Sequence, residues 1–304
     1  MKKVMNAILL FFGVVMMACS PYKVKDGVLL EVNPKRFYEK IVQIPEGVRE
    51  ISEYAFSNCV SIEEVIFPES LEIIGDCAFL GCENLVKADI PEGVRVIGRD
   101  AFWKCEKLEK IIVPSSVEEI GGRAFRNCRG VLYLNCDVEY AEGNDRPFGG
   151  ACFSSIVIGD KVTKIVDWQF LGMDGRNDRG VLRPGTGSGL KMESVHIPEG
   201  VVSIGENAFS YCKLNSLVIP STVRHIGKEA FYYSGIKHLY FKSTVPPKIG
   251  DGALFTHRGN LQEKAVTVHV PKGCKDVYLK AWRNYKDSGV GLAHRPYYFY
   301  IQEM

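Results

Sequence analysis

The chain has 304 residues, of which 46% are hydrophobic, so it is long enough to bury a large core. Its 38 Lys and Arg residues nearly balance its 36 Asp and Glu residues, which leaves a formal net charge of +2. This balance excludes the strongly basic surface of a typical nucleic-acid-binding protein, so we expect no nucleic-acid partner.

The first residues are typical of an export signal. Lys2 and Lys3 form a positively charged segment, residues 7–18 form an apolar run, and Cys19 follows. An apolar run of this length is too short to span a bilayer, which takes about 20 residues. We therefore expect a signal peptide over residues 1–19 and export of the remainder of the chain.

The stretch Met16–Cys19 resembles a bacterial lipobox, in which the cysteine is lipidated after the signal is cleaved. It departs from that pattern at Met16, where Leu is usual, and at Met17, where a small residue is usual. The resemblance implies a lipid anchor on Cys19. An ordinary secretory signal cleaved near Ala18 is the alternative.

A fixed spacing organises the rest of the chain. Phenylalanines recur every 23 residues, and prolines keep step with the first four of them. The phenylalanines are Phe56, Phe79, Phe102, Phe125 and Phe148, and the prolines are Pro45, Pro68, Pro91 and Pro114. A period of this size indicates a stack of one small supersecondary unit, in which each coil buries its apolar side against its neighbours. Aligned on the phenylalanine, the first coils cover residues 41–63, 64–86, 87–109 and 110–132.

Each coil repeats the same short elements. The alternating apolar pair before the proline, such as Val65 and Phe67, predicts a short strand with one buried face. The proline ends this strand because it has no N–H to donate to a ladder hydrogen bond. A small Ala before each Phe is expected to let neighbouring coils pack closely while the Phe fills the interior. A glycine precedes this pair, and we expect it to permit a sharp turn. These glycines are Gly75, Gly98, Gly121, Gly205 and Gly227.

The pattern continues through a less regular middle. Asp137 stands in the proline position, at the same distance before Phe148 as Pro45 stands before Phe56. Pro147 and Gln169 take the position of the small Ala, so we expect the two middle coils to bend or loosen.

An insertion interrupts the pattern once. About 16 residues are added after Phe170, and the stretch 174–189 is rich in Gly, Arg and Asp, which predicts a surface loop. Its run Gly185–Lys191 lacks the spacing of a phosphate-binding loop. Regular coils resume at 195–215 and 216–235, and a variant coil follows from Ile236 through Phe255.

Caps are expected at both ends. Val28–Val32 is expected to cap the first coil, and the strand Val266–Val270 precedes a helix that covers the last one. That helix would carry an apolar stripe at helical spacing, made of Tyr278, Ala281, Trp282 and Tyr285. Tyr297–Ile301 predicts an edge strand. The predicted units are a signal peptide (1–19), a linker and cap (20–40), the repeat solenoid (41–255) and a C-terminal cap (256–304).

The repeat pattern is seen nearly whole at Ile90–Leu108 and is Ile-Pro-Glu-Gly-Val-x-x-Ile-Gly-x-x-Ala-Phe-x-x-Cys-x-x-Leu. It resembles the BspA-like leucine-rich repeats. The resemblance covers roughly residues 41–285. It implies an α/β leucine-rich-repeat solenoid, curved, with a parallel β-sheet on one face and short helices or turns on the other. It also implies an exported, lipid-anchored protein of the bacterial outer membrane or cell surface, and adhesion to host or bacterial partners.

Ten cysteines in an exported protein suggest disulfides at first sight. Five of them nevertheless occupy one repeat position and are expected to form a column of small buried hydrophobic side chains. These are Cys59, Cys82, Cys105, Cys128 and Cys212. Cys152, in an irregular coil, is the best candidate for a reactive or paired thiol. The sequence has no Cys-x-x-Cys, so we expect no metal and no cofactor.

Histidines and tyrosines gather on the outward face of the later strands. His196, His238 and His269 each fall between inward residues, so they point out of the sheet. The candidate binding residues are His196, Val218, His238, Tyr240 and His269, with the loop 174–189 at one rim. A solvated sheet face with no partner is an equal alternative. A metal site is disfavoured because the three coils are not all adjacent and no carboxylate joins them.

The sequence offers no catalytic motif. It contains no Gly-x-Ser-x-Gly elbow and no His-Glu-x-x-His helix, and its carboxylates recur at turn positions. We therefore predict a binding protein and not an enzyme, with a surface protein or a glycan as partner. Two alternatives stay open, namely a glycan-binding accessory protein and a thiol-dependent hydrolase using Cys152 with a nearby His.

Overall fold

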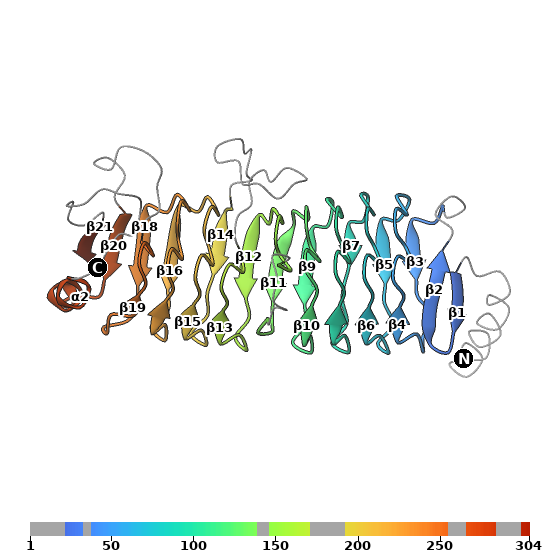
Figure 1. Ribbon diagram of the computed structural model, residues 1–304, viewed down its shortest axis with the longest axis horizontal. Coiled ribbons are helices and arrows are strands. Elements are labelled where there is room, and N and C mark those ends of the chain that lie inside the picture. The colour runs from blue at the N-terminus through green and yellow to red at the C-terminus, as the bar shows by residue number, and fades with distance from the viewer. Residues whose placement is uncertain (1–21, 33–37, 139–145, 171–191, 255–265, 284–298) are drawn as a thin grey trace, which may run out of the picture.

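The computed structural model describes residues 22–32, 38–138, 146–170, 192–254, 266–283 and 299–304. Their strands stack into one elongated row of coils, with the N-terminal strands at one end and the helix α2 at the other (Figure 1). Each coil crosses the row twice, so the strands fall into two columns. The solenoid with a parallel sheet that the repeat predicts is confirmed.

The first column consists of the strands that precede each proline position, with β21 (Phe299–Glu303) added at its C-terminal edge, and its paired strands run parallel. Their side chains alternate, so that residues such as Val65 and Leu217 are buried while their neighbours face outward. The strands are β3 (Ile41–Gln43), β5 (Glu64–Ile66), β7 (Lys87–Ala88), β9 (Lys110–Val113), β11 (Val131–Leu134), β12 (Ser155–Ile158), β14 (Ser194–His196), β16 (Ser216–Ile219), β18 (His238–Phe241), β20 (Val266–Val270) and β21 (Phe299–Glu303).

A second column runs alongside, on the side where short helices or turns were expected. β1 (Tyr22–Lys25) pairs antiparallel with β2 (Val28–Val32), which starts a parallel series of two-residue strands. The series is β4 (Glu50–Ile51), β6 (Ile73–Ile74), β8 (Val96–Ile97), β10 (Glu119–Ile120), β13 (Lys164–Ile165), β15 (Ser203–Ile204), β17 (His225–Ile226) and β19 (Lys248–Ile249). One coil, whose first-column strand is β11, separates the coils of β10 and β13. Its residues 139–145 lie outside the described part of the chain.

The repeated phenylalanines form a continuous stack inside the solenoid. Phe56, Phe79, Phe102 and Phe125 lie with ring centroids 5.1–5.5 Å apart and planes within 8° of parallel. The alanine before each ring is fully buried, as the sequence predicts. Beside this stack, the cysteines after Cys59 direct their Sγ to the backbone oxygen of the Phe one coil earlier, for example Cys105 to Phe79 at 3.2 Å. The predicted cysteine column is therefore confirmed as part of the core.

The repeated glycine has a different role from the one expected. Its φ is not positive, and the left-handed residue is the one two positions later, such as Asp100 (φ +54°) after Gly98. A Cβ on Gly98 would lie 2.5 Å from the backbone nitrogen of Asp76 in the preceding coil. Glycine is required there because successive backbones approach closely, and not because the chain turns.

The middle coils depart from the regular stack. The planes of Phe148 and Phe170 are inclined by 32°, and those of Phe170 and Phe209 by 27°. Gln169, in the alanine position, is buried, and its Oε1 accepts a hydrogen bond from the Val166 backbone N–H at 2.8 Å. The rings of these coils are tilted, and the bending or loosening expected here stays a prediction. The inserted loop 174–189 lies outside the described residues.

The two caps are largely as the sequence predicts. The strands β2 and β20 coincide with the predicted segments, and β21 is a parallel edge strand on β20 that begins at Phe299. Helix α2 (Lys275–Trp282) buries Tyr278 and Trp282 against the last coil. Ala281 was expected in the same stripe but is exposed, because only the i and i+4 positions of this short helix face the coil. Tyr285 lies outside the described residues.

Candidate functional site

The register of the C-terminal sheet brings the predicted side chains into one row. Val218 of β16 pairs with Tyr240 of β18, and Tyr240 pairs with His269 of β20. The adjacent outward position of β18 holds His238, which pairs with Thr267. We call the surface formed by His196, Val218, His238, Tyr240 and His269 the histidine–tyrosine face. Because paired residues of parallel strands share a side, these outward side chains meet at the surface.

Three of these five side chains are in direct contact. The Nδ1 of His238 lies 3.1 Å from the Nε2 of His269, a hydrogen bond in which one ring nitrogen donates and the other accepts. The rings of Tyr240 and His269 stack at 4.3 Å with an interplanar angle of 11°. Burial and the neighbouring His238 both lower the pKa of His269 from its usual value near 6.5. The lowered pKa favours the neutral form of His269, and its stacked ring and that of Tyr240 offer a flat aromatic surface with polar edges.

The other two residues extend the face without joining the cluster. Val218 lies beside Tyr240 and is 43% exposed. His196 is exposed on β14, which pairs with β12 and contacts β16. It lies two strands from His238, so the sequence argument against a three-histidine metal site agrees with the strand order. The loop 174–189, predicted at the rim, is not among the described residues.

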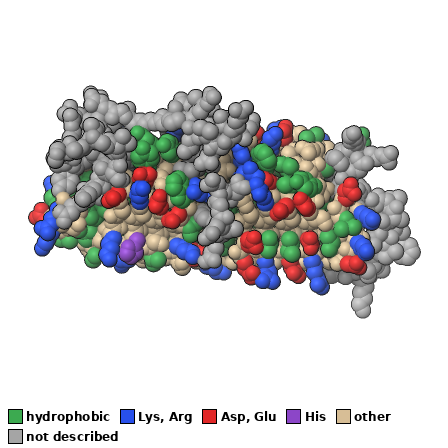
Figure 2. Space-filling model, viewed as in Figure 1, with side chains coloured by type: hydrophobic (Ala, Val, Ile, Leu, Met, Phe, Trp, Pro, Cys, Tyr) green, Lys and Arg blue, Asp and Glu red, His purple; other side chains and the backbone are tan. Residues whose placement is uncertain are grey.

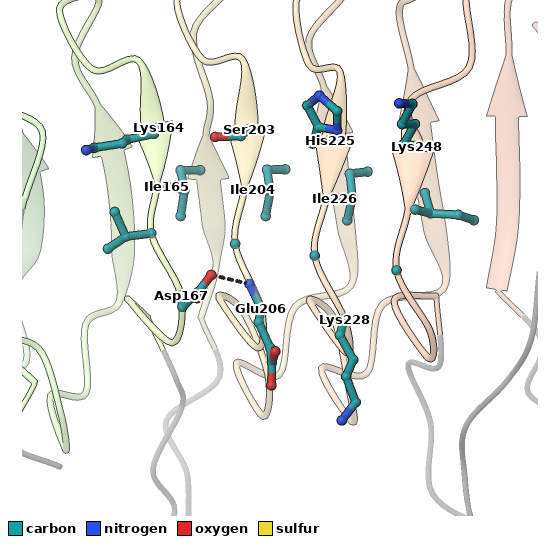
Figure 3. A pocket seen from close by; sticks show the side chains of 15 residues that line it. Lys164, Ile165, Asp167, Ser203, Ile204, Glu206, His225, Ile226, Lys228 and Lys248 are labelled. Carbon is teal, nitrogen blue, oxygen red and sulfur yellow. Dashed lines mark hydrogen bonds between the residues drawn. The ribbon is translucent and has the colours of Figure 1, made fainter. Parts of the chain in front are cut away.

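A second site was missed by sequence reasoning. A groove of about 730 Å³ runs along β13, β15, β17 and β19 of the second column. Its outward positions form a row of Lys164, Ser203, His225 and Lys248, with Asp167, Glu206 and Lys228 along the other rim (Figure 3). The glycines between the two rows, Gly205, Gly227 and Gly250, carry no side chain and leave the space open. Basic side chains and histidine gather over these strands in the space-filling view (Figure 2).

The opposite half of the second column has a different character. Its outward positions, in β4, β6, β8 and β10, are Glu50, Ile73, Val96 and Glu119. The same structural row therefore starts with acidic and apolar side chains and ends with basic and polar ones. In the sequence, this change of charge is carried by the residue just before each repeated isoleucine. Pattern reasoning misses these positions because a two-residue strand shows no alternation.

The thiols of the core are poorly suited to chemistry. Burial raises the pKa of Cys59 and of Cys136 to about 11, and it raises the pKa of Cys82, Cys105 and Cys128 further. The nine cysteines in the described residues are all free of disulfides. Cys152, the candidate reactive thiol, is half-buried, and its Sγ lies 4.0 Å from the Gly150 carbonyl oxygen. Its reactivity stays a prediction.

The described residues contain no group of three or more His, Cys, Asp or Glu side chains placed to hold a metal ion. They also contain no helix with the length and apolar character needed to cross a membrane.

Comparison with known proteins identifies the repeat. Six copies of the BspA type leucine rich repeat region match residues 35–142 and 188–285, which is more than half of the chain. The chain belongs to the BspA-type leucine-rich repeat family. Leucine-rich repeat proteins generally mediate protein–protein interaction. No curated protein matches significantly.

Solved structures of leucine-rich repeat proteins are also similar to this chain. One from Bacteroides ovatus is 18% identical, with 90% of this chain and 87% of that chain covered and a TM-score of 0.37. A leucine rich cell surface protein from Faecalibacterium prausnitzii is 18% identical, with 77% and 83% covered and a TM-score of 0.37. A leucine rich repeat protein from T. pallidum is 21% identical, with 78% and 87% covered and a TM-score of 0.36.

Proposed function

We propose that this protein is an exported, lipid-anchored leucine-rich repeat protein that binds a surface protein of a host or bacterial cell through its histidine–tyrosine face. The observation that carries the proposal is the contact cluster of His238, Tyr240 and His269 on a rigid parallel sheet. Aromatic groups whose positions are already fixed lose little entropy on binding, and Tyr is enriched at protein interfaces. The adjacent Val218 adds exposed apolar area.

The proposed location rests on the N-terminal sequence. The charged and apolar segments before Cys19 support export, and a lipid chain on Cys19 would hold the solenoid at the outer membrane or cell surface. Mass analysis of the N-terminal peptide from the native producer tests the anchor. Protease shaving of intact cells tests the location, because a surface protein is lost from shaved cells and a periplasmic one is retained.

The face is tested by substitution. We expect the combined change of His196, His238, Tyr240 and His269 to Ser to leave folding intact and to abolish binding to partner-bearing cells. The matched control changes Gln43, Ile66 and Ile112, which lie on the same sheet face in the first coils, to Ser. The control should bind like the unaltered protein. Binding that survives the first set of changes would refute the site, and loss of binding in both sets would place the contact elsewhere on the sheet.

A glycan is the second candidate partner, because three tyrosines cluster just after Phe209 and Phe231. Tyr211, Tyr232 and Tyr233 lie with ring centroids 4.2–5.9 Å apart and are half-buried. Aromatic faces of this kind can support the apolar side of a sugar ring. A ligand that binds the folded state raises the melting temperature. A shift with polysaccharide but not with matrix protein, removed by Tyr211→Ser and Tyr233→Ser, would favour the glycan and overturn the protein partner.

A further inference from the structure

The groove on the second column has two rims of different chemistry (Figure 3). The outward residues of its four strands form the first rim, which carries two ammonium groups, a hydroxyl and an imidazole. These residues are Lys164, Ser203, His225 and Lys248. The residues three positions later in the first three coils form the second rim and are Asp167, Glu206 and Lys228. The groove therefore presents cations to one side of a ligand and mostly carboxylates to the other.

The floor between the rims is backbone whose N–H groups are already engaged. Gly205, Gly227 and Gly250 have no side chain, and each donates its N–H to the oxygen of the isoleucine one coil earlier, at 2.7, 2.7 and 2.8 Å. A peptide strand lying on this floor would find no N–H at these glycines to pair with, so its own backbone groups would lose water without gaining partners. The floor instead suits a chain of sugar rings, which needs only surface contact there.

We infer that the groove binds an anionic polysaccharide rich in uronic acids, with the sugar chain lying along the solenoid axis. Its carboxylates would face the lysine rim, and its ring hydroxyls would donate to Asp167 and Glu206. A sugar residue of an extended polysaccharide is about as long as one strand spacing, about 4.8 Å. The four coils of the groove therefore hold about four sugar residues, and its volume of about 730 Å³ lies in the usual range of ligand sites.

The carboxylates of the second rim favour a polysaccharide over an acidic peptide. Asp167 accepts the backbone N–H of Glu206 through its Oδ1 at 2.7 Å, which fixes this carboxylate at the rim (Figure 3). An acidic peptide would gain at the lysine rim and be repelled by Asp167 and Glu206. A uronic acid polymer carries hydroxyls on the same rings as its carboxylates, and hydroxyls donate strong hydrogen bonds to ionised carboxylates. A ligand with both groups therefore matches both rims.

Calorimetric titration with polygalacturonate, using the full-length chain in a non-ionic detergent, tests the class of ligand. We expect binding at low salt that weakens as ionic strength rises, because exposed ion pairs are screened. Methyl-esterified polygalacturonate keeps the hydroxyls and lacks the charge, whereas poly-L-glutamate keeps the charge and lacks the hydroxyls. Both should bind about tenfold more weakly or worse. Absence of polygalacturonate binding, or equal binding of either control polymer, would overturn the proposal.

Charge removal on the first rim tests the location of the site. Lys164→Gln with Lys248→Gln should weaken polygalacturonate binding about tenfold, the effect of losing two exposed ion pairs. Lys40→Gln with Lys87→Gln, on the first column, changes the net charge equally and should leave the affinity unchanged. Equal affinities of the two variants would refute the groove as the site.

The groove is separate from the histidine–tyrosine face, because the groove lies on the second column and the face on the first. The variant with both lysines of the groove changed should therefore still bind partner-bearing cells. The chain altered in the histidine–tyrosine face should still bind polygalacturonate. Loss of both activities in either variant would overturn the separation of the two sites.

A change of shape provides an independent test of the groove. Ser203 lies at the outward position of β15, within the first rim, so Ser203→Trp should cover the floor and abolish binding with no change of charge. Gln43→Trp, at an outward position of β3, is the control and should bind polygalacturonate like the unaltered chain. Circular dichroism checks the folding of each variant. A Ser203→Trp chain that folds and still binds would contradict the proposal.

Discussion

At the residue scale, neighbouring coils approach most closely at the repeated glycine position. Gly75 hydrogen-bonds through its N–H to the Ile51 oxygen at 2.8 Å, and Gly98 bonds to the Ile74 oxygen at 2.7 Å. These bonds hold successive backbones in contact and leave no room for a Cβ. In the coil of β13, Val166 takes the glycine position. The requirement for glycine is therefore not set by the repeat position alone.

We predict that Gly98→Ala lowers the free energy of unfolding by about 1–3 kcal/mol, because the added methyl meets the backbone of Asp76 at 2.5 Å. The control is Val166→Ala, which places the same side chain in the same repeat position, where the chain already accommodates a larger one. It should cost less than Gly98→Ala. Denaturant unfolding followed by circular dichroism measures both, and equal costs would contradict the close-approach explanation.

The cysteine column also belongs to the residue scale. Burial raises the pKa of Cys59 to about 11, so at neutral pH almost no thiolate is present there. A thiol that stays protonated and buried neither pairs nor reacts. This explains how the chain can carry many cysteines as packing residues, with Sγ of Cys128 directed to the Phe102 oxygen at 3.2 Å.

Among the elements, the helix α2 closes the apolar end of the stack. Trp282 packs edge-on against Phe241 and Phe299 and donates its Nε1–H to the Pro247 oxygen at 2.9 Å. Tyr278 donates its hydroxyl to the Ser243 oxygen at 2.7 Å. Repeat proteins need such a cap because the terminal coil has no further neighbour to cover its apolar face.

We predict that Trp282→Ala destabilises the C-terminal coils by about 3–5 kcal/mol, the usual cost of removing a buried aromatic side chain. Leu279→Ala, on the exposed side of the same helix, is the control and should change stability by less than about 0.5 kcal/mol. Hydrogen exchange should show the loss of protection in β18 and β20 first. Uniform loss of protection over the whole chain would mean that the helix is not a local cap.

The sequence predicts the first column well and the second column poorly, for one physical reason. Strands such as Lys110–Val113 carry two buried residues separated by an outward one, so their alternation is visible in the text. Strands such as Val96–Ile97 contain a single buried residue and no alternation. The cluster of His238, Tyr240 and His269 follows from the repeat phase, whereas the stacking and hydrogen bonding within it depend on rotamers that no pattern encodes.

For the whole molecule, stability is approximately a sum over coils and the contacts between neighbouring coils. The phenylalanine stack makes these contacts uneven. Phe102 lies nearly parallel to both neighbours, at 8° and 3°, whereas Phe170 is inclined by 32° and 27° to its own. Next to Phe170, the alanine of the regular repeat is replaced by Gln169, whose buried side chain is tied to the backbone. We therefore expect the contact between neighbouring coils to be weaker at Phe170 than at Phe102.

We predict that Phe102→Ala lowers the free energy of unfolding by about 3–5 kcal/mol and that Phe170→Ala costs about 0.5–1.5 kcal/mol less. Both rings are buried, so the two substitutions remove similar area and differ mainly in the stacking they lose. Hydrogen exchange of the unaltered protein should show β13 opening before β6 and β8. If β13 exchanges as slowly as β8, or if Phe170→Ala proves the costlier change, the contact between the coils at Phe170 is not weaker. The tilt of the rings then carries no energetic penalty.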